Sequence, residues 1–184
     1  TTSGLYDNTT PVQDVSGTTD TALNANITGL LQGKTYYFRV CAQNSSNTGY
    51  GSEMTFKTLD TIPPSCSIVI NNNAPYSNSN NITLSLSATD NAVVAGYYLS
   101  LSDVVPSATS GGWVAVTPEL SYSETVPYTL SSGDGSKTVY VWYKDDAGNI
   151  SATTSDSIDV DTTAPVVSIT SPSSEATYTT TAST

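Results

Sequence analysis

The chain has 184 residues, no histidine, and five Lys or Arg against sixteen Asp or Glu, for a formal net charge of −11 at pH 7. This charge argues against nucleic acid and anionic membranes as partners. The lack of histidine removes the most common general base and transition-metal ligand, and we expect no enzyme activity within these residues. No run of about 18 apolar residues is present, so no membrane insertion is predicted for this segment.

The chain shows no sustained 3.6-residue apolar period, and several short segments alternate apolar with polar residues, which predicts an all-β fold. The first alternating segment runs from Tyr36 to Ala42 and follows Leu30, Gly33 and Thr35. After it come an Asn- and Gly-rich stretch and a second segment, Met54–Thr58. We therefore predict a strand, a loop and a final strand in this part of the chain.

These residues resemble the second half of a fibronectin type III module, with Gln32 at a position where that family usually has Pro. The resemblance implies that residues 1–59 are a partial module. A half sandwich leaves an open sheet edge and an uncovered face. We expect strands from upstream residues, or from another copy of the chain, to complete it.

A short phrase of the sequence occurs twice. Asp60-Thr61-Ile62-Pro63-Pro64 returns about 100 residues later as Asp161-Thr162-Thr163-Ala164-Pro165. This spacing is about that of one small β-sandwich, which is typical of tandem modules separated by stiff joints. We predict a linker at 60–64, a complete module at 65–160, and a second linker with the start of a next module at 161–184.

The central module is expected to contain seven strands, near Cys66–Ile70, Ile82–Ala88, Ala95–Leu101, Gly112–Val116, Thr125–Leu130, Lys137–Tyr143 and Ser155–Val160. The period of two places alternate residues on one buried face. The predicted core is Cys66, Ile68, Ile70, Ile82, Leu84, Leu86 and Ala88, packed against Tyr97, Leu99, Leu101, Val139, Val141 and Tyr143.

Several motifs in this stretch resemble the bacterial immunoglobulin-like repeats of large surface and secreted proteins. They are the Asp-Thr-x-x-Pro joint, Ser87-Ala88-Thr89-Asp90, Gly96-Tyr97-Tyr98, Gly112-Trp113-Val114, the run from Thr138 to Asp145, and Asp146-Ala147-Gly148-Asn149. The resemblance implies tandem immunoglobulin-like and fibronectin type III β-sandwiches, and it is specific for fold rather than for function.

In an immunoglobulin-like topology, the loops after the second and sixth strands lie at the same end as the entering joint. That pole would gather oxygen-rich side chains, namely Asp60, Asp90, Asn91, Asp145, Asp146 and Asn149. Calcium takes six to eight oxygen ligands of these kinds, so one hypothesis is a calcium site that stiffens the joint. The other is that these residues simply form turns. No further cofactor is expected.

Three aromatic residues, Tyr98, Tyr140 and Trp142, are out of phase with the predicted core and are expected to form a strip on the outer face of one sheet. Such a strip can pack against a partner or stack on a glycan. Ordinary cross-strand pairing explains it without a ligand, and we favour this reading.

The two cysteines have unlike predicted settings, with Cys41 on the outward side of its strand and Cys66 on the inward side. A disulfide between them requires closely spaced Cα atoms. Both a disulfide and two free thiols therefore remain open.

The first functional hypothesis is a structural or adhesive segment of a long secreted or cell-surface protein, or of an extracellular filament. Its partners would be neighbouring modules, copies of the same chain, or a glycan or surface receptor. The alternative is a spacer or accessory region, with carbohydrate binding as one variant, of a secreted polysaccharide-degrading enzyme or protease.

Overall fold

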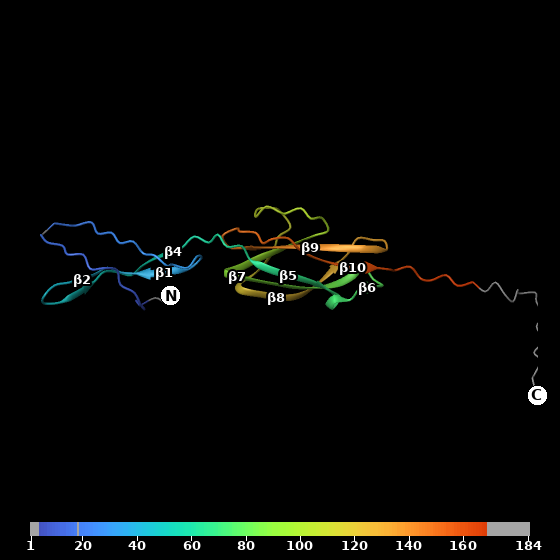
Figure 1. Ribbon diagram of the computed structural model, residues 1–184, viewed down its shortest axis with the longest axis horizontal. Helices are drawn as coiled ribbons and strands as arrows, with labels where there is room; N and C mark the ends of the chain where they lie inside the picture. The colour runs from blue at the N-terminus through green and yellow to red at the C-terminus, as the bar shows by residue number, and fades with distance from the viewer. Residues whose placement is uncertain (1–3, 18, 169–184) are drawn as a thin grey trace, which may run out of the picture.

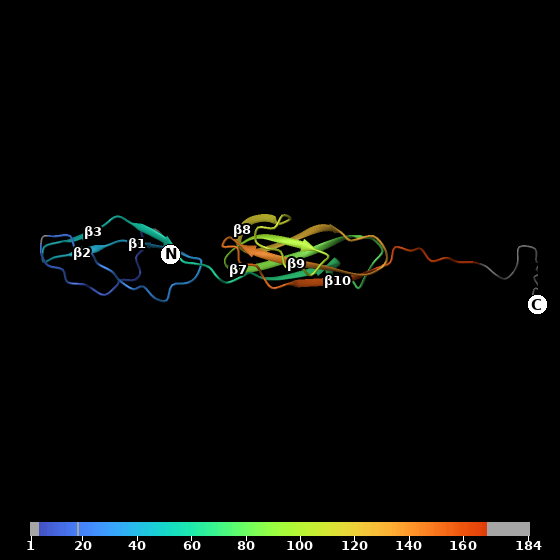
Figure 2. The ribbon, with the colours of Figure 1, turned by 90° about the horizontal axis from the view of Figure 1, so that it is seen from above.

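The computed structural model describes residues 4–17 and 19–168, and it confirms that the chain is nearly all β. Two β regions lie end to end along the long axis of the molecule, joined by residues 59–64 (Figures 1 and 2). Residues 161–168 leave the second region at its opposite end. Within the described ranges, no helix is long and apolar enough to cross a membrane.

The first region consists of two short antiparallel ladders, β1 (Thr35–Phe38) with β4 (Met54–Lys57), and β2 (Cys41–Gln43) with β3 (Thr48–Tyr50). The alternating segment predicted as one strand is thus divided between β1 and β2. Over residues 4–17 and 19–58, no side chain is buried. The apolar face of these ladders is therefore open.

The second region is one six-stranded sheet with the strand order β5-β7-β9-β10-β6, in which β8 pairs with β7. Its strands are β5 (Ser65–Ile70), β6 (Tyr76–Ser77), β7 (Asn81–Ser100), β8 (Val114–Thr129), β9 (Gly135–Asp145) and β10 (Thr154–Val160). A single 3-10 turn, η1 (Asn71–Asn73), follows β5, and all three of its residues have positive φ. Asn tolerates this left-handed conformation better than most residues, which explains the Asn run.

Two long strands replace four of the predicted ones. β7 spans both the second and the third predicted strands, and β8 spans the fourth and fifth. The first half of β7 pairs with β5 and its second half with β9, while β8 follows both halves. The register shifts between Thr89 and Gly96, where the strands bend. This bend curls the sheet so that both halves of β7 face one core.

The core of the second region agrees closely with the predicted set. Its buried members are Ile68, Ile70, Ile82, Leu84, Leu86, Ala88, Val94, Tyr97, Leu130, Val139, Val141, Tyr143, Ile158 and Val160, with Cys66 and Leu99 packed against them. The prediction for Leu101 is wrong, because this residue follows the end of β7 and is 45% exposed. Both cysteines are free, with Cys41 exposed and Cys66 partly buried, so the disulfide does not form.

Replacing Gly96 with Ala is expected to destabilise this curled sheet. A Cβ atom at position 96 would lie 2.9 Å from the carbonyl oxygen of Val114 on the neighbouring strand β8. We expect the free energy of unfolding to fall by about 1–3 kcal/mol, as for other overpacked sites. Urea unfolding measures this change. Gly111→Ala is the matched control, since its Cβ would meet no atom within 4 Å, and an equal loss in both variants would contradict the prediction.

Candidate functional site

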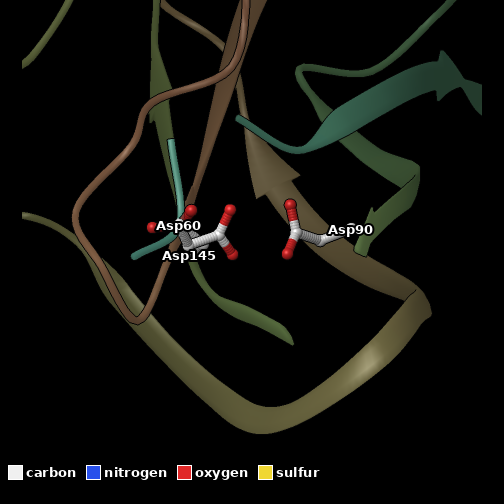
Figure 3. A group of neighbouring side chains, drawn as sticks. All are labelled: Asp60, Asp90 and Asp145. Carbon is white, nitrogen blue, oxygen red and sulfur yellow. The ribbon is translucent and has the colours of Figure 1, made fainter. Parts of the chain in front are cut away.

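Three aspartates meet at the pole of the second region that faces the first (Figure 3). Asp60 belongs to the joint, Asp90 lies at the bend of β7, and Asp145 is the last residue of β9. In Figure 3, the carboxylate of Asp90 faces those of Asp60 and Asp145. The topology thus brings together residues that are far apart in the sequence.

The carboxylates are close together, and two of them are largely removed from water, while Asp90 is half-buried. One oxygen of each lies within 4.8 Å of an oxygen of the other two. Asp60 is 4% exposed and Asp145 is 2% exposed. No residue in the described part of the chain forms an ion pair with any of the three. Buried carboxylates without a cationic partner are rare, because removing a charge from water is costly.

Two asparagines orient these carboxylates. The side-chain amide of Asn149 donates to Asp145 Oδ2 at 2.6 Å and to the carbonyl of Asp60 at 3.1 Å. The backbone amide of Asn149 donates to Asp145 Oδ1 at 2.8 Å. Asn91 Nδ2 donates to both carboxylate oxygens of Asp60, at 3.1 and 3.2 Å. The carboxylates of Asp60 and Asp145 are therefore held in fixed orientations.

Asp90 is the least satisfied member of the group. Its Oδ2 accepts a hydrogen bond from the backbone amide of Ala92 at 2.7 Å. Its Oδ1 and the neighbouring Asn91 Oδ1 are buried and have no hydrogen-bond partner among the described residues. Burial, aided by the charges of Asp60 and Asp145, raises the pKa of Asp90. The ionised form of Asp90 is thus disfavoured by its surroundings as they stand.

The sixth residue of the predicted set, Asp146, does not join the group. It is exposed, and its Oδ2 forms an ion pair with Lys57 Nζ at 2.7 Å. Asp146 follows the last residue of β9, and its carboxylate is directed to Lys57 rather than to the other three aspartates. Its inclusion in the predicted cation site is therefore wrong.

Sequence reasoning missed the contribution of the first region to this pole. Lys34 Nζ donates to the backbone carbonyl of Asn91. A Cβ on Gly33 would lie 2.6 Å from Asp60 Oδ2 and 2.7 Å from the Cβ of Ala92, so this glycine allows close contact. Gln32 could have indicated this contact. It stands where the resemblance to fibronectin type III modules leads one to expect Pro, and unlike Pro its side chain can accept hydrogen bonds.

The aromatic strip has the predicted neighbours but not the predicted exposure. The ring of Trp142 contacts those of Tyr98 and Tyr140, each with centroids 6.2 Å apart. However, Trp142 is fully buried, and its Nε1 donates to Thr153 Oγ1 at 3.0 Å. The prediction that Trp142 lies on an exposed strip is wrong. A sugar could not stack on this ring, because stacking needs an accessible face.

The loop between β7 and β8 is fastened to the same outer face. Lys144 Nζ donates to the carbonyl of Ala108 at 2.9 Å and lies 4.7 Å from the ring centre of Trp113. The ring of Trp113 in turn contacts Tyr98, with centroids 5.6 Å apart. These aromatic residues are therefore explained by packing within the chain.

Comparison with known proteins adds no relative, since the sequence matches no protein-family model and no curated protein. The functional argument therefore rests on the residues themselves. The three aspartates at this pole offer carboxylate oxygens as ligands, and Asp60 is held in place by the joint. Such a set suits hard cations.

Proposed function

We propose that this chain is a non-catalytic structural segment of an extracellular or cell-surface protein, in which immunoglobulin-like and fibronectin type III-like modules follow one another in line and hold other parts apart. The observation on which this proposal rests is a joint geometry that occurs twice, at the entrance and at the exit of the second region. We also propose that both regions have β-sandwich folds.

The sandwich assignment is supported by the course of the strands. β5, the first half of β7 and the end of β8 form one side of the curled sheet. The second half of β7 with β9 and β10 forms the other, and β6 adds to β10 in parallel. Side chains from both sides share one core. This arrangement is what an immunoglobulin-like sandwich requires.

At the entering joint, Thr61 is held by the first region. Its backbone amide and its Oγ1 both donate to Gln32 Oε1, at 2.9 and 2.8 Å. The preceding residue, Asp60, accepts from the backbone amide of Ile62 at 3.1 Å, which tightens the turn. The joint is thus fastened to the module that it leaves.

The leaving joint repeats this pattern with different residues. The backbone amide and the Oγ1 of Thr162 both donate to Asp134 Oδ1, at 2.7 and 2.8 Å. Asp161 Oδ1 accepts from the backbone amide of Thr163 at 3.1 Å. Gln32 and Asp134 each precede a glycine with positive φ, just ahead of β1 and at the start of β9. Both joints are thus fixed by the same kinds of hydrogen bond. This repetition favours a spacer in which successive modules keep a defined direction.

The proposal predicts that the two β regions keep a fixed distance. Spin labels on Cys41 and on Thr117→Cys, in a Cys66→Ser background, report this distance by double electron–electron resonance. We expect one narrow distribution, because the joint residues are held from both sides. A broad distribution in the unmutated joint would contradict a spacer with a fixed joint.

The variant Gln32→Ala tests the contact that fixes the entering joint. It removes the acceptor of two hydrogen bonds, each contributing about 0.5–1.5 kcal/mol, so the distance distribution should broaden. Gln43→Ala is the matched control, since Gln43 is an exposed residue of β2. Equal distributions in both variants would show that the Gln32 contact does not hold the joint.

The location is tested separately. Antibodies raised against the chain should label intact, unpermeabilised cells of the source organism or its culture medium. Labelling that appears only after permeabilisation would contradict the extracellular assignment.

A further inference from the structure

We propose that Asp60, Asp90 and Asp145 bind one divalent cation in the joint, and that calcium is the ion that fits them. This inference concerns the same joint as the proposed spacer but does not depend on the spacer role. Cation binding and the fixed distance between the regions are measured separately, so either can fail alone.

The first step is the accumulation of three negative charges, which Lys57 offsets only from a distance. Three carboxylates share a volume in which their oxygens lie no more than 4.8 Å apart. The nearest lysines of the first region are engaged elsewhere, with Lys57 paired to Asp146 and Lys34 bonded to the carbonyl of Asn91. Since like charges repel strongly at low dielectric, this arrangement calls for a cation.

The second, independent step is the pair of unpartnered oxygens. Asp90 Oδ1 and Asn91 Oδ1 are buried, with almost no surface exposed to water, yet neither accepts a hydrogen bond within the described ranges. Buried oxygens in native proteins nearly always have a partner, and an exception needs an explanation. A cation beside Asp90 supplies the missing partner for its Oδ1.

The third step is the identity of the ion. The candidate ligands are carboxylates and one amide oxygen, which hard cations prefer. Ligands on opposite sides of a calcium ion are separated by twice the calcium–oxygen distance, about 4.6–5.2 Å, whereas for magnesium this separation is about 4.2 Å. The three ligand atoms all lie within 4.8 Å of one another, so one calcium shell can include them. Calcium also accepts such an all-protein oxygen set in flexible geometry, whereas magnesium usually keeps several waters.

The rival explanation is a proton. If Asp90 were neutral, its Oδ1 could carry a hydrogen and donate to one of the other two carboxylates. Both explanations relieve the repulsion among Asp60, Asp90 and Asp145. They differ in their response to calcium at neutral pH, since only a cation site binds it in a saturable way.

Isothermal titration of the full 184-residue chain with calcium chloride at pH 7 is the test. We expect one ion per chain with a dissociation constant on the order of 10⁻⁴ M, as in other extracellular modules. Bound calcium should also raise the thermal midpoint by several degrees, because it binds only the folded chain. Wild-type protein that shows no saturable binding up to about 100 times this concentration would overturn the proposal.

The variant Asp90→Asn keeps the shape of the side chain and removes its charge. We expect it to weaken calcium binding at least tenfold and to abolish the calcium-dependent rise of the midpoint. Asp103→Asn removes an equal charge from an exposed loop and should bind as the wild type does. Equal affinity in both variants would mean that calcium binds elsewhere. Circular dichroism checks that both fold, and if Asp90→Asn does not, Asp145→Asn takes its place.

Discussion

Replacing Trp142 with Ala is expected to lower the free energy of unfolding of the second region by about 3–5 kcal/mol, which is the usual loss for a large buried aromatic. The side chain is fully buried and contacts the rings of Tyr98 and Tyr140. Truncation would leave a cavity and remove the hydrogen bond to Thr153. Urea unfolding followed by circular dichroism measures the change.

Two further variants make this result decisive. Trp142→Phe keeps an aromatic ring and loses the hydrogen bond, so it should cost less than Ala and remain measurable if the Ala variant does not fold. Tyr76→Ala removes an aromatic residue that is 70% exposed, and we expect a change within about 0.5 kcal/mol. If Trp142→Ala were as mild as Tyr76→Ala, the ring would lie on the surface, and a glycan-stacking strip would again be tenable.

Replacing Gly33 with Val is expected to separate the first region from the pole. Gly33 has a φ of +67°, and its added Cβ would lie 2.6 Å from Asp60 Oδ2 and 2.7 Å from the Cβ of Ala92. Backbone strain and overpacking each cost about 1–3 kcal/mol. The backbone strain is present whether the joint is closed or open, so the collision alone, about 1–3 kcal/mol, should shift the equilibrium roughly 5- to 150-fold toward the open form. The distance distribution between labels at positions 41 and 117 should broaden accordingly.

A matched glycine separates these two costs. Gly29 has a similar φ of +74°, but a Cβ there would meet no atom within 4 Å. Gly29→Val therefore has the backbone strain without the collision, and it should leave the joint closed. A narrow distribution in both variants would contradict the contact of Gly33 with the pole.

Much of the second region could be predicted because its pattern is local. Alternation along β5, β7 and β9 marks the inner face, and the core residues found there follow that pattern. The joint phrase and the Asp and Asn turns likewise predicted which pole gathers carboxylates. Leu101 and Asp146 each lie one residue beyond the end of a strand, β7 and β9 respectively. The alternation of inward and outward side chains no longer holds there.

Other features could not be predicted because they depend on contacts between distant segments. Trp142 is out of phase with the core, yet rings on neighbouring strands and Thr153 bury it. β7 continues past Asp90 because β8 pairs with both of its halves. Gln32, Gly33 and Lys34 reach the pole only because the first region is docked end to end with the second.

The all-β class, the buried face of most strands and the acidic character of the entering pole could thus be predicted from the sequence alone. These properties follow from periodicity and composition, which are set residue by residue. Only the tertiary structure decided which carboxylates face each other, that the outer aromatic strip is covered, and how the first region closes on the joint. Those outcomes depend on which side chains approach across strands and across the joint, and no local pattern encodes such distances.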